Sequence, residues 1–513
     1  MPAKQNTKDT GHKQAAISLL VLIFAASVLG VYLIAGTVLI SKDGVFYTKR
    51  ARELSDYSAV TGRKDAPGYP FLIFAAHEFA AMLTHDSSLS GWIYSAQSIT
   101  LLFRLLALIP LYFIGQLLVG GRKSFYAMLI LILLPHPAKM SCEVTREWPY
   151  ILFLAAGFLC LLMGARRGKW WTFGLAGLCA GLGYWIRPEC AQLVIYGFMW
   201  LTLCMFRPGV GKISRSRSLA ALASLFVAFA LPALPYIKYT GHIISPNATH
   251  VFKMISHNTT PHRTDVREND ADGADCYAAR IVPADIAKAL GEIFSSIGEN
   301  LMWFFMPALL IGFYYRLQHG AKLEERFLIT VFVLMNLSLM VCRYCYIEAH
   351  ISNRWTLPLV AFTVFYICDG LHVIENRLSS MFKFGSLKGQ KSQLGLILLL
   401  IGITICLPKL LRPAGIDKRG FRIAAAWLKN NTDRQDIIAV PDIRISFYAE
   451  REGLLYSDSI PGKAKYVVRI AKGEGDELSS DRIGQKEYSV EVDTRKKSKK
   501  RVVIYHRPEK GLL

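Results

Sequence analysis

The chain has 513 residues, of which 52% are hydrophobic, and its mean hydropathy of +0.30 is too high for a soluble domain. Its formal net charge of +22 invites a nucleic-acid-binding interpretation, but the lysines and arginines lie largely in short breaks between apolar runs and in one C-terminal segment. This distribution is typical of a membrane protein with basic cytoplasmic loops, so we expect no nucleic-acid partner.

Runs of about twenty apolar residues predict about eleven membrane-spanning helices, and hence an all-α polytopic membrane protein. The first run is too long for the core of a signal peptide, so we predict that it is an anchor. The predicted spans are residues 16–40, 93–118, 124–140, 149–165, 170–187, 189–206, 219–239, 293–315, 327–342, 356–374 and 395–411.

Basic residues gather in alternate breaks of this arrangement. They lie in the N-terminal segment and near residues 122–123, 166–169, 207–217, 316–326 and 377–391. By the positive-inside rule, that side of the membrane is the cytoplasm. The outer side then has the room for chemistry, and it receives residues 41–92, 141–148, 240–292 and 343–355 and the tail from residue 412.

The tail is polar and is predicted to form a small outer α/β domain, residues 412–513, after a membrane domain of residues 1–411. An amphipathic helix is expected at residues 420–431, and short strands at 436–440, 444–448, 466–470 and 501–505. We interpret the basic run at 495–501 as a solvated turn, with contact to anionic lipid headgroups as the alternative.

Asp43 follows the first predicted span directly, within the sequence SKDGVFY of residues 41–47. A carboxylate placed where a helix leaves the hydrocarbon can have its pKa raised, and it can then take a proton from an acceptor hydroxyl. The alternative is a turn residue, because Asp-Gly is a common turn pair.

Arg104 lies near the middle of the predicted span 93–118. A charge at that depth should face the protein interior and pair, so Arg104 is either a member of a structural ion pair or a contact to a lipid phosphate. We favour the structural role.

No cofactor and no metal are predicted, because the 12 histidines show no ligand spacing such as H-E-x-x-H. His257 and His262 share the loop 240–292 with several aspartates, so a metal there is one interpretation. A loop that caps the substrate is the favoured one.

Five short motifs follow one another along the chain. They are DGVFY at residues 43–47, PGYP at 67–70, CEVTREWPY at 142–150, GLGYWIRPE at 181–189 and HISNRWTLP at 350–358. This succession resembles the dolichyl-phosphate-mannose protein mannosyltransferase and aminoarabinose transferase superfamily, which has the GT-C fold. The tail, with AAWLK at residues 425–429 and DIRISFY at 442–448, is similar to the C-terminal outer domain of these enzymes. One departure is Ala66, because a His often precedes the PGYP motif in the family.

The resemblance implies that Asp43 is the general base or orients the acceptor, and that Glu147 is a second catalytic carboxylate. Either residue is alternatively a structural partner of Arg146 or Arg187. Arg187 and Arg354 are predicted at outer helix ends, which makes them candidates for holding a donor phosphate, with headgroup anchoring as the alternative. The same motifs supply the other substrate-binding candidates, which are Tyr47, Tyr69, Glu189 and His350.

The function implied by the resemblance is transfer of a sugar from a polyprenyl-phosphate carrier, with inversion, to a lipid, glycan or protein acceptor. The enzyme would work at the outer, periplasmic face of the cell inner membrane, among membrane lipids. One alternative is a lipid-linked-glycan transporter or flippase, for which repeat symmetry and broken helices near the midplane are expected. Another is a glycan polymerase or ligase; the order of the motifs favours the single-sugar transferase.

Overall fold

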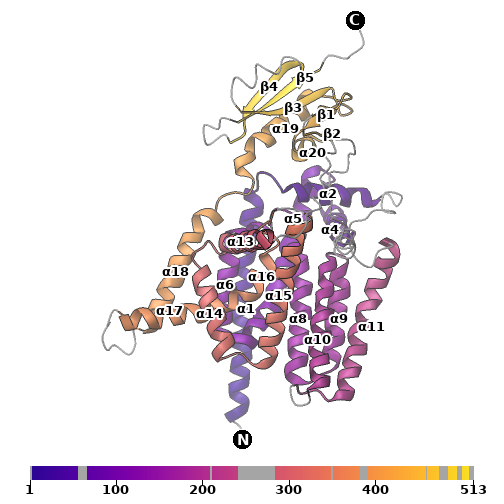
Figure 1. Ribbon diagram of the computed structural model, residues 1–513. Helices are drawn as coiled ribbons and strands as arrows, with labels where there is room; N and C mark the ends of the chain where they lie inside the picture. Colours follow the sequence, from indigo (N-terminus) through magenta and orange to yellow (C-terminus); the bar gives the residue numbers. More distant parts are fainter. Residues whose placement is uncertain are drawn as a thin grey trace.

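The computed structural model describes residues 3–55, 66–207, 211–240, 283–347, 350–381, 391–457, 459–472, 483–493 and 500–507. A bundle of long helices carries a small α/β domain at one end, the top in Figure 1. The all-α polytopic architecture with a C-terminal α/β domain is therefore confirmed. Within the described residues, seven helical stretches are long and apolar enough to cross a membrane.

The long helices of the bundle follow most of the predicted spans. Two glycines on one face of α9 allow it to pack directly on α11: a Cβ on Gly181 would lie 2.6 Å from the Phe229 carbonyl oxygen. The helices are α1 (Ala3–Gly36), α5 (Leu89–Val119), α6 (Gly121–Leu133), α8 (Glu147–Arg167), α9 (Trp171–Tyr184), α10 (Gln192–Phe206), α11 (Arg215–Thr240), α14 (Met306–His319), α15 (Leu323–Tyr346), α17 (Ile367–Met381) and α18 (Lys391–Leu410).

Shorter helices join the long ones, and several gather at the end of the bundle that carries the α/β domain. Figure 1 shows α2, α4 and α13 at that end. The short helices are α2 (Lys42–Arg52), η1 (Glu53–Ser55), α4 (Gly68–Thr84), α7 (Pro135–Lys139), η2 (Pro188–Ala191), α13 (Pro283–Asn300), α16 (Leu357–Thr363) and η3 (Val364–Tyr366).

Two of the predicted spans are not continuous helices. The span predicted at 124–140 is interrupted at Leu134, which is extended because the following Pro135 excludes the helical conformation there. The span predicted at 293–315 is interrupted between α13 and α14, where Met302 and Trp303 have φ values of 55° and 57°. α13 is a separate amphipathic helix with polar residues along one side.

The α/β domain is built on a five-stranded sheet of order β2-β1-β3-β5-β4. β1 is parallel to β2 and β3, whereas β5 is antiparallel to β3 and β4. On α19 the Trp427 ring stacks on Tyr488 of β4 at 5.3 Å. The elements are η4 (Ile416–Lys418), α19 (Arg419–Asn431), β1 (Ile437–Val440), α20 (Ile443–Ala449), β2 (Glu452–Leu455), β3 (Tyr466–Ala471), β4 (Gln485–Glu491) and β5 (Arg501–His506).

The strand predicted at residues 444–448 is wrong, because this segment is the helix α20. Asp442 caps the helix: its side chain accepts a hydrogen bond from the Arg444 backbone N–H at 3.1 Å. The predicted helix at 420–431 and the strands at 436–440, 466–470 and 501–505 are confirmed, and β2 and β4 were not predicted. The boundary after residue 411 stays a prediction, and most of the basic run lies outside the described residues, as do His257 and His262.

Candidate active site

The helix α2 places Asp43 in its first turn. Ser41 caps this helix, because its side-chain oxygen accepts a hydrogen bond from Gly44 N–H at 2.9 Å. A carboxylate in the first turn is favoured by the helix dipole. Ser41 also donates to the Glu143 carbonyl oxygen, from its backbone N–H at 3.3 Å and from its hydroxyl at 2.9 Å. Asp43 is therefore held against the loop of residues 141–146.

Gly44 is needed for this contact. A Cβ at that position would lie 2.7 Å from the Glu143 carbonyl oxygen, closer than a carbon atom can approach. The Gly of the Asp-Gly pair thus serves a close approach between two segments, and Asp43 belongs to a helix rather than to a turn.

Arg354 pairs with Asp43 across the site. Its Nη1 donates to the Asp43 Oδ2, although the two residues are 311 positions apart in the sequence. The Asp43 side chain is 37% exposed and that of Arg354 is 31% exposed, so the pair is accessible from the solvent side. The structure thus brings together the predicted base and a predicted phosphate ligand.

A second group joins Glu147, Arg187 and Glu189. Glu147 begins α8, and its carboxylate lies 3.6 Å from Arg187 Nη1. Arg187 Nε lies 3.4 Å from Glu189, and the guanidinium covers the Tyr150 ring at 5.1 Å. One buried arginine is therefore shared between two carboxylates, one of which was predicted to be catalytic.

Two polar atoms of this second group lack a hydrogen bond. Within the described part of the chain, Glu147 Oε2 and Arg187 Nε are buried and make no hydrogen bond, although Arg187 Nε lies in the ion pair with Glu189. A buried polar group without a partner costs about 1–3 kcal/mol, so such atoms are suited to a polar ligand. The group can accept a bond from a hydroxyl and donate one to an anion.

The tyrosines Tyr47 and Tyr69 form a wall between α2, α4 and α5. Their rings meet edge to face at 5.0 Å, and the Tyr69 hydroxyl lies 2.6 Å from the hydroxyl of Thr100. The backbone N–H of Gly68 donates to the Trp185 carbonyl oxygen at 2.9 Å. The PGYP motif therefore packs directly on the GLGYWIRPE motif, so the two motifs can contribute to one site.

His350 lies apart from the two acid–arginine groups. Its side chain is 75% exposed, and Nδ1 is 3.8 Å from Glu292 on α13. The neighbouring Asn353 donates to Glu299 of the same helix at 2.7 Å. The segment 350–353 is thus tied to α13, and a substrate role for His350 stays a prediction.

Arg104 supports the loop from beneath. Its Nη2 donates to the Ile132 carbonyl oxygen at 2.8 Å, and its guanidinium lies 5.5 Å from the centre of the Trp148 ring. The side chain is fully buried in α5. These contacts agree with a structural role, but the predicted ion pair is wrong, because the partners of Arg104 among the described residues are the neutral Ser141 hydroxyl and Ile132 carbonyl groups.

Four further residues at the site were not predicted as site residues from the sequence, although Arg146 was considered as a structural partner of the carboxylates. Arg146 lies over the Tyr47 ring at 6.0 Å, and Arg343 lies over the Trp355 ring at 3.8 Å. Glu143 carries the carbonyl that holds Ser41. Arg146, Glu143 and the fourth residue, Tyr150, all lie within the motif at 142–150, so their place in it was the available signal.

Comparisons with known proteins agree with this architecture. A family model described as dolichyl-phosphate-mannose-protein mannosyltransferase matches residues 93–236. No curated protein sequence matches the chain.

Two solved structures resemble the chain over most of its length. ArnT from Cupriavidus metallidurans bound to undecaprenyl phosphate has a TM-score of 0.58 and 12% identity, over 94% of this chain and 97% of that one. Oligosaccharyltransferase AglB from Archaeoglobus fulgidus, in complex with an inhibitory peptide and a dolichol-phosphate, has a TM-score of 0.56 and 12% identity, over 89% and 69%. The chain is therefore a multi-pass membrane protein with the GT-C glycosyltransferase fold.

Proposed function

We propose that the chain is a glycosyltransferase that moves a sugar from a polyprenyl-phosphate carrier to an acceptor at the outer face of the cell inner membrane. One observation carries this proposal: two carboxylates and two arginines from four separate segments meet in acid–arginine groups at the end of the bundle next to the α/β domain. The order of the motifs and the shared fold support it. The acceptor would be a lipid, a glycan or a protein.

In the proposed reaction, an acceptor hydroxyl oxygen attacks the anomeric carbon of the donor sugar. The new carbon–oxygen bond forms while the bond from that carbon to the phosphate oxygen breaks. The proton of the hydroxyl passes to the Asp43 carboxylate, and the polyprenyl phosphate leaves with the electron pair of the broken bond. Attack opposite the leaving group inverts the anomeric configuration.

Donor binding is proposed to release the base. In the structure Arg354 is the partner of Asp43, and a carboxylate that is paired with a guanidinium is a weak base. The donor is a phosphodiester with one negative charge, like a carboxylate, and its two free oxygens can take the guanidinium with two parallel hydrogen bonds; the charge rises when the polyprenyl phosphate leaves. The Asp43 carboxylate would then face the acceptor hydroxyl without a guanidinium partner, and it would be a stronger base.

The group around Arg187 is proposed to orient the reactants. Arg187 is shared between Glu147 and Glu189, so the group as a whole carries one net negative charge. The remaining oxygen of Glu147 can accept a hydrogen bond from a sugar or acceptor hydroxyl. The guanidinium can contribute a hydrogen bond to the phosphate as its charge develops.

The test is a comparison of cells that contain the protein with cells that lack it. Mass analysis of their glycolipids, cell-wall polymers and glycoproteins should show one product that differs by a single sugar residue. The product should return with the wild-type gene and not with the Asp43→Asn variant. Identical profiles in all strains would contradict the proposal.

Transfer of a whole glycan is a second candidate, because the fold match includes an oligosaccharyltransferase. The same mass analysis separates the two candidates. A difference of several sugars, moved as one block, would favour the glycan transferase.

A further inference from the structure

The path of the chain into α2 depends on residues at the far end of the sequence. α1 ends at Gly36 and α2 begins at Lys42, so the backbone between them lies outside both helices. Val38 N–H donates to the Ala414 carbonyl oxygen at 3.0 Å, and Ile40 N–H donates to the Tyr448 hydroxyl oxygen at 3.1 Å. Two amides of this connection are therefore held by residues that follow the last predicted span.

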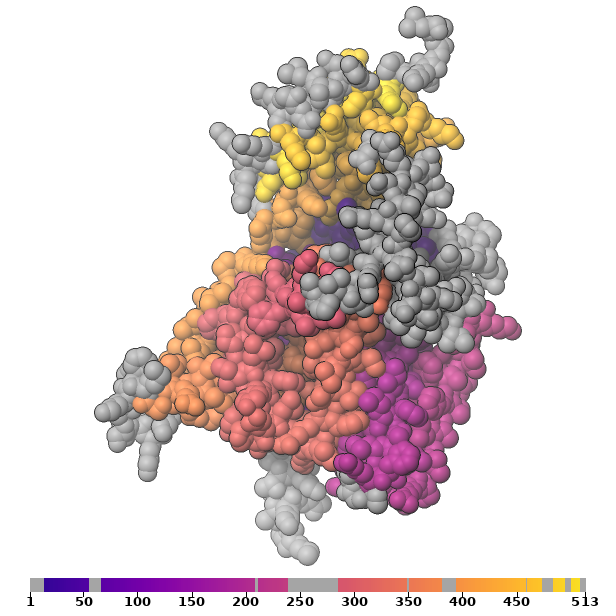
Figure 2. Space-filling view, viewed as in Figure 1, coloured from indigo at the N-terminus to yellow at the C-terminus, as the bar shows by residue number. Residues whose placement is uncertain are grey.

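The connection between α1 and α2, residues 37–41, packs closely against the C-terminal domain, and two of its apolar residues are buried from solvent. Leu39 and Ile40 are 2% and 0% exposed. Gly415 has a φ of 71°, and a Cβ there would lie 2.6 Å from the Leu39 carbonyl oxygen. In Figure 2 the indigo residues that follow α1 lie between the bundle and the orange C-terminal domain. The connection is thus enclosed by the C-terminal domain on one side and by the loop of residues 141–146 on the other.

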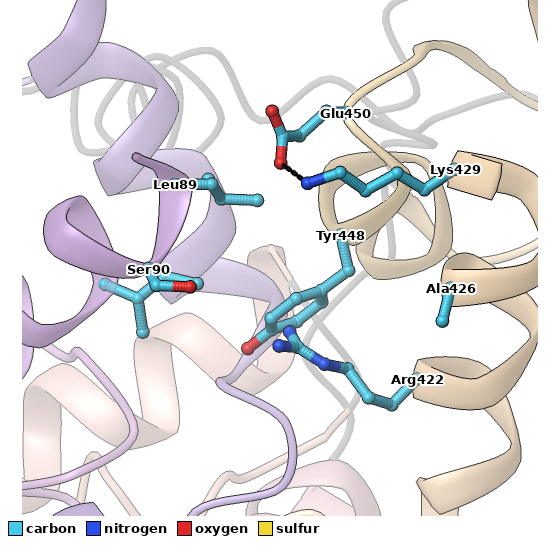
Figure 3. A pocket seen from close by; sticks show the side chains of 8 residues that line it. Leu89, Ser90, Arg422, Ala426, Lys429, Tyr448 and Glu450 are labelled. Atoms are coloured by element: carbon cyan, nitrogen blue, oxygen red, sulfur yellow. Dashed lines mark hydrogen bonds and ion pairs between the residues drawn. The ribbon is translucent and has the colours of Figure 1, made fainter. Parts of the chain in front are cut away.

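Tyr448 is the central residue of this contact. Its ring is covered by the Arg422 guanidinium at 3.9 Å, and 7% of the residue is exposed. Figure 3 shows Tyr448 and Arg422 in the wall of a pocket of about 130 Å³ between the start of α5 and the helices α19 and α20. The hydroxyl points toward the backbone that leads to Asp43, where it accepts the hydrogen bond from Ile40 N–H.

Asp442 adds a second tie from the same helix. Its carboxylate holds Arg444 through two hydrogen bonds of 2.9 and 2.7 Å and lies 3.9 Å from Lys42 Nζ. Lys42 is the residue before Asp43, and its side chain is 58% exposed, so this ion pair is weak. The Tyr448 hydrogen bond is buried and therefore contributes more.

We propose that Tyr448 is a positioning residue for Asp43, and that the C-terminal domain is in this way part of the catalytic apparatus. The inference rests on the proposed function, in which Asp43 is the base. Loss of the hydroxyl leaves the buried Ile40 N–H without its partner. The connection can regain a partner only by shifting, and a shift there moves the first turn of α2.

Tyr448→Phe is the direct test, because it removes one oxygen and keeps the ring. Tyr456→Phe is the matched control: its hydroxyl donates to the Val468 carbonyl oxygen at 2.6 Å within the same domain and has no contact with the connection. Product formation in complemented cells should fall by about 10- to 100-fold in Tyr448→Phe, since a displacement of about 1 Å has effects of this size. Tyr456→Phe should keep near wild-type product formation.

Two measurements separate positioning from a general loss of structure. Binding of undecaprenyl phosphate to purified Tyr448→Phe should remain within about twofold of wild type, because the phosphate contacts are unchanged. Hydrogen exchange should become about tenfold faster in peptides that cover residues 38–44 and stay unchanged in the sheet, as expected for loss of one hydrogen bond.

Wild-type product formation in Tyr448→Phe, or equal losses in both variants, would overturn the inference. Exchange that rises throughout the C-terminal domain would also overturn it, because the role would then be structural. The exchange measurement does not need a reaction. Failure of the proposed function would therefore leave the faster exchange at 38–44 in place, whereas failure of the inference would remove it.

Discussion

At the scale of single residues, the candidate site contains acids that pair with arginines. Asp43 faces Arg354, and Glu147 faces Arg187. Such pairs are stable without substrate, and each arginine can exchange its carboxylate for a phosphate. We therefore make separate predictions for Asp43 and for Arg354, the acid and the arginine of one pair.

For the acid, Asp43→Asn keeps the size of the side chain but cannot take a proton. Product formation should fall by about 10² to 10⁴-fold, the usual contribution of a general base. Binding of undecaprenyl phosphate should be kept or become severalfold tighter, because Arg354 loses its competing partner. Glu78→Gln, which removes an exposed carboxylate from α4, is the control and should be neutral.

Turnover of Asp43→Asn close to the wild-type rate would make Asp43 a structural residue and Glu147 the leading candidate for the base. Asp43→Glu should retain a small part of the activity, because the carboxylate survives but is displaced by about one methylene.

For the arginine, Arg354→Lys keeps the charge but removes the planar fork that binds two phosphate oxygens. The affinity for undecaprenyl phosphate, measured by titration in detergent, should fall by about tenfold, the effect of one lost charged hydrogen bond. Arg187→Lys should act in the same direction. Arg434→Lys, on the exposed surface of the C-terminal domain, is the matched control. Unchanged affinity in both site variants would assign these arginines to structural ion pairs with their carboxylates.

The ionisation of Glu143 should make folding stability depend on pH. Burial raises the pKa of its carboxyl from 4.5 to about 7, against the opposing effect of Lys139 and Arg444 and with the support of Glu147 and Asp417. The unfolded chain loses this proton near pH 4.5, whereas the folded protein keeps it up to about pH 7. The contribution of Glu143 to folding stability should therefore be most favourable below pH 4.5 and should become less favourable as the pH rises to 7.

The Glu143→Gln variant should lack this part of the pH dependence. Since the side chain is only half-buried, we expect the loss between the two pH limits to be about 1–2 kcal/mol, less than the full shift implies. Thermal unfolding in detergent across this pH range, with wild type alongside, measures the difference. Parallel curves for the two proteins would contradict the prediction.

At the scale of helices, glycines determine which pairs of helices can pack with their backbones in contact. α14 and α17 cross with their backbones in contact, because a Cβ on Gly370 would fall on the Ala308 carbonyl oxygen. Gly370→Ala should lower the free energy of unfolding by about 1–3 kcal/mol through overpacking.

Gly291 provides the matched control for this substitution. It lies within α13, and a Cβ there would have nothing within 4 Å. Gly291→Ala should therefore be neutral or raise stability by up to about 1 kcal/mol. Equal thermal midpoints for the Gly370→Ala and Gly291→Ala variants would refute the backbone contact.

The helices that the sequence predicted best are those with long uniform apolar runs. The span 149–165 corresponds to α8, and 219–239 lies within α11. The break at Leu134 had a visible cause in Pro135, and Pro307, in the first turn of α14, marks the restart of the helix after Met302 and Trp303. α20 was mistaken for a strand because its apolar residues alternate, and its helical form depends on the Asp442 cap and on burial of the whole segment.

The sequence predicted the individual residues of the candidate site, but it did not predict which of them form ion pairs with each other. The motifs identified Asp43, Glu147, Arg187 and Arg354 separately. Their pairing depends on how distant segments fold together, since Arg354 and Asp43 are 311 positions apart. The hold of Tyr448 on Ile40 spans 408 positions and has no local signature in the sequence.

At the scale of the whole molecule, the candidate site and the C-terminal domain lie at the same end of the bundle. Asp43, at the start of α2, is joined to that domain through Ile40 and Tyr448. The side on which this domain lies therefore decides which side of the membrane holds the chemistry. The predicted basic loops put that side outside the cell membrane.

A cysteine in place of Ser459, in the C-terminal domain, tests this orientation in a variant with the native cysteines replaced. An impermeant thiol reagent should label it in cells whose outer barrier is opened but whose inner membrane is intact. Gln318→Cys, exposed near the end of α14 at the opposite end of the bundle, is the control and should be labelled only after the inner membrane is opened. The reverse pattern would place Asp43 and the C-terminal domain in the cytoplasm, where a donor and acceptor would have to be sought among cytoplasmic lipids. Such a result would overturn the predicted topology and the proposed face of transfer together, while leaving the acid–arginine pairs and their chemistry unchanged.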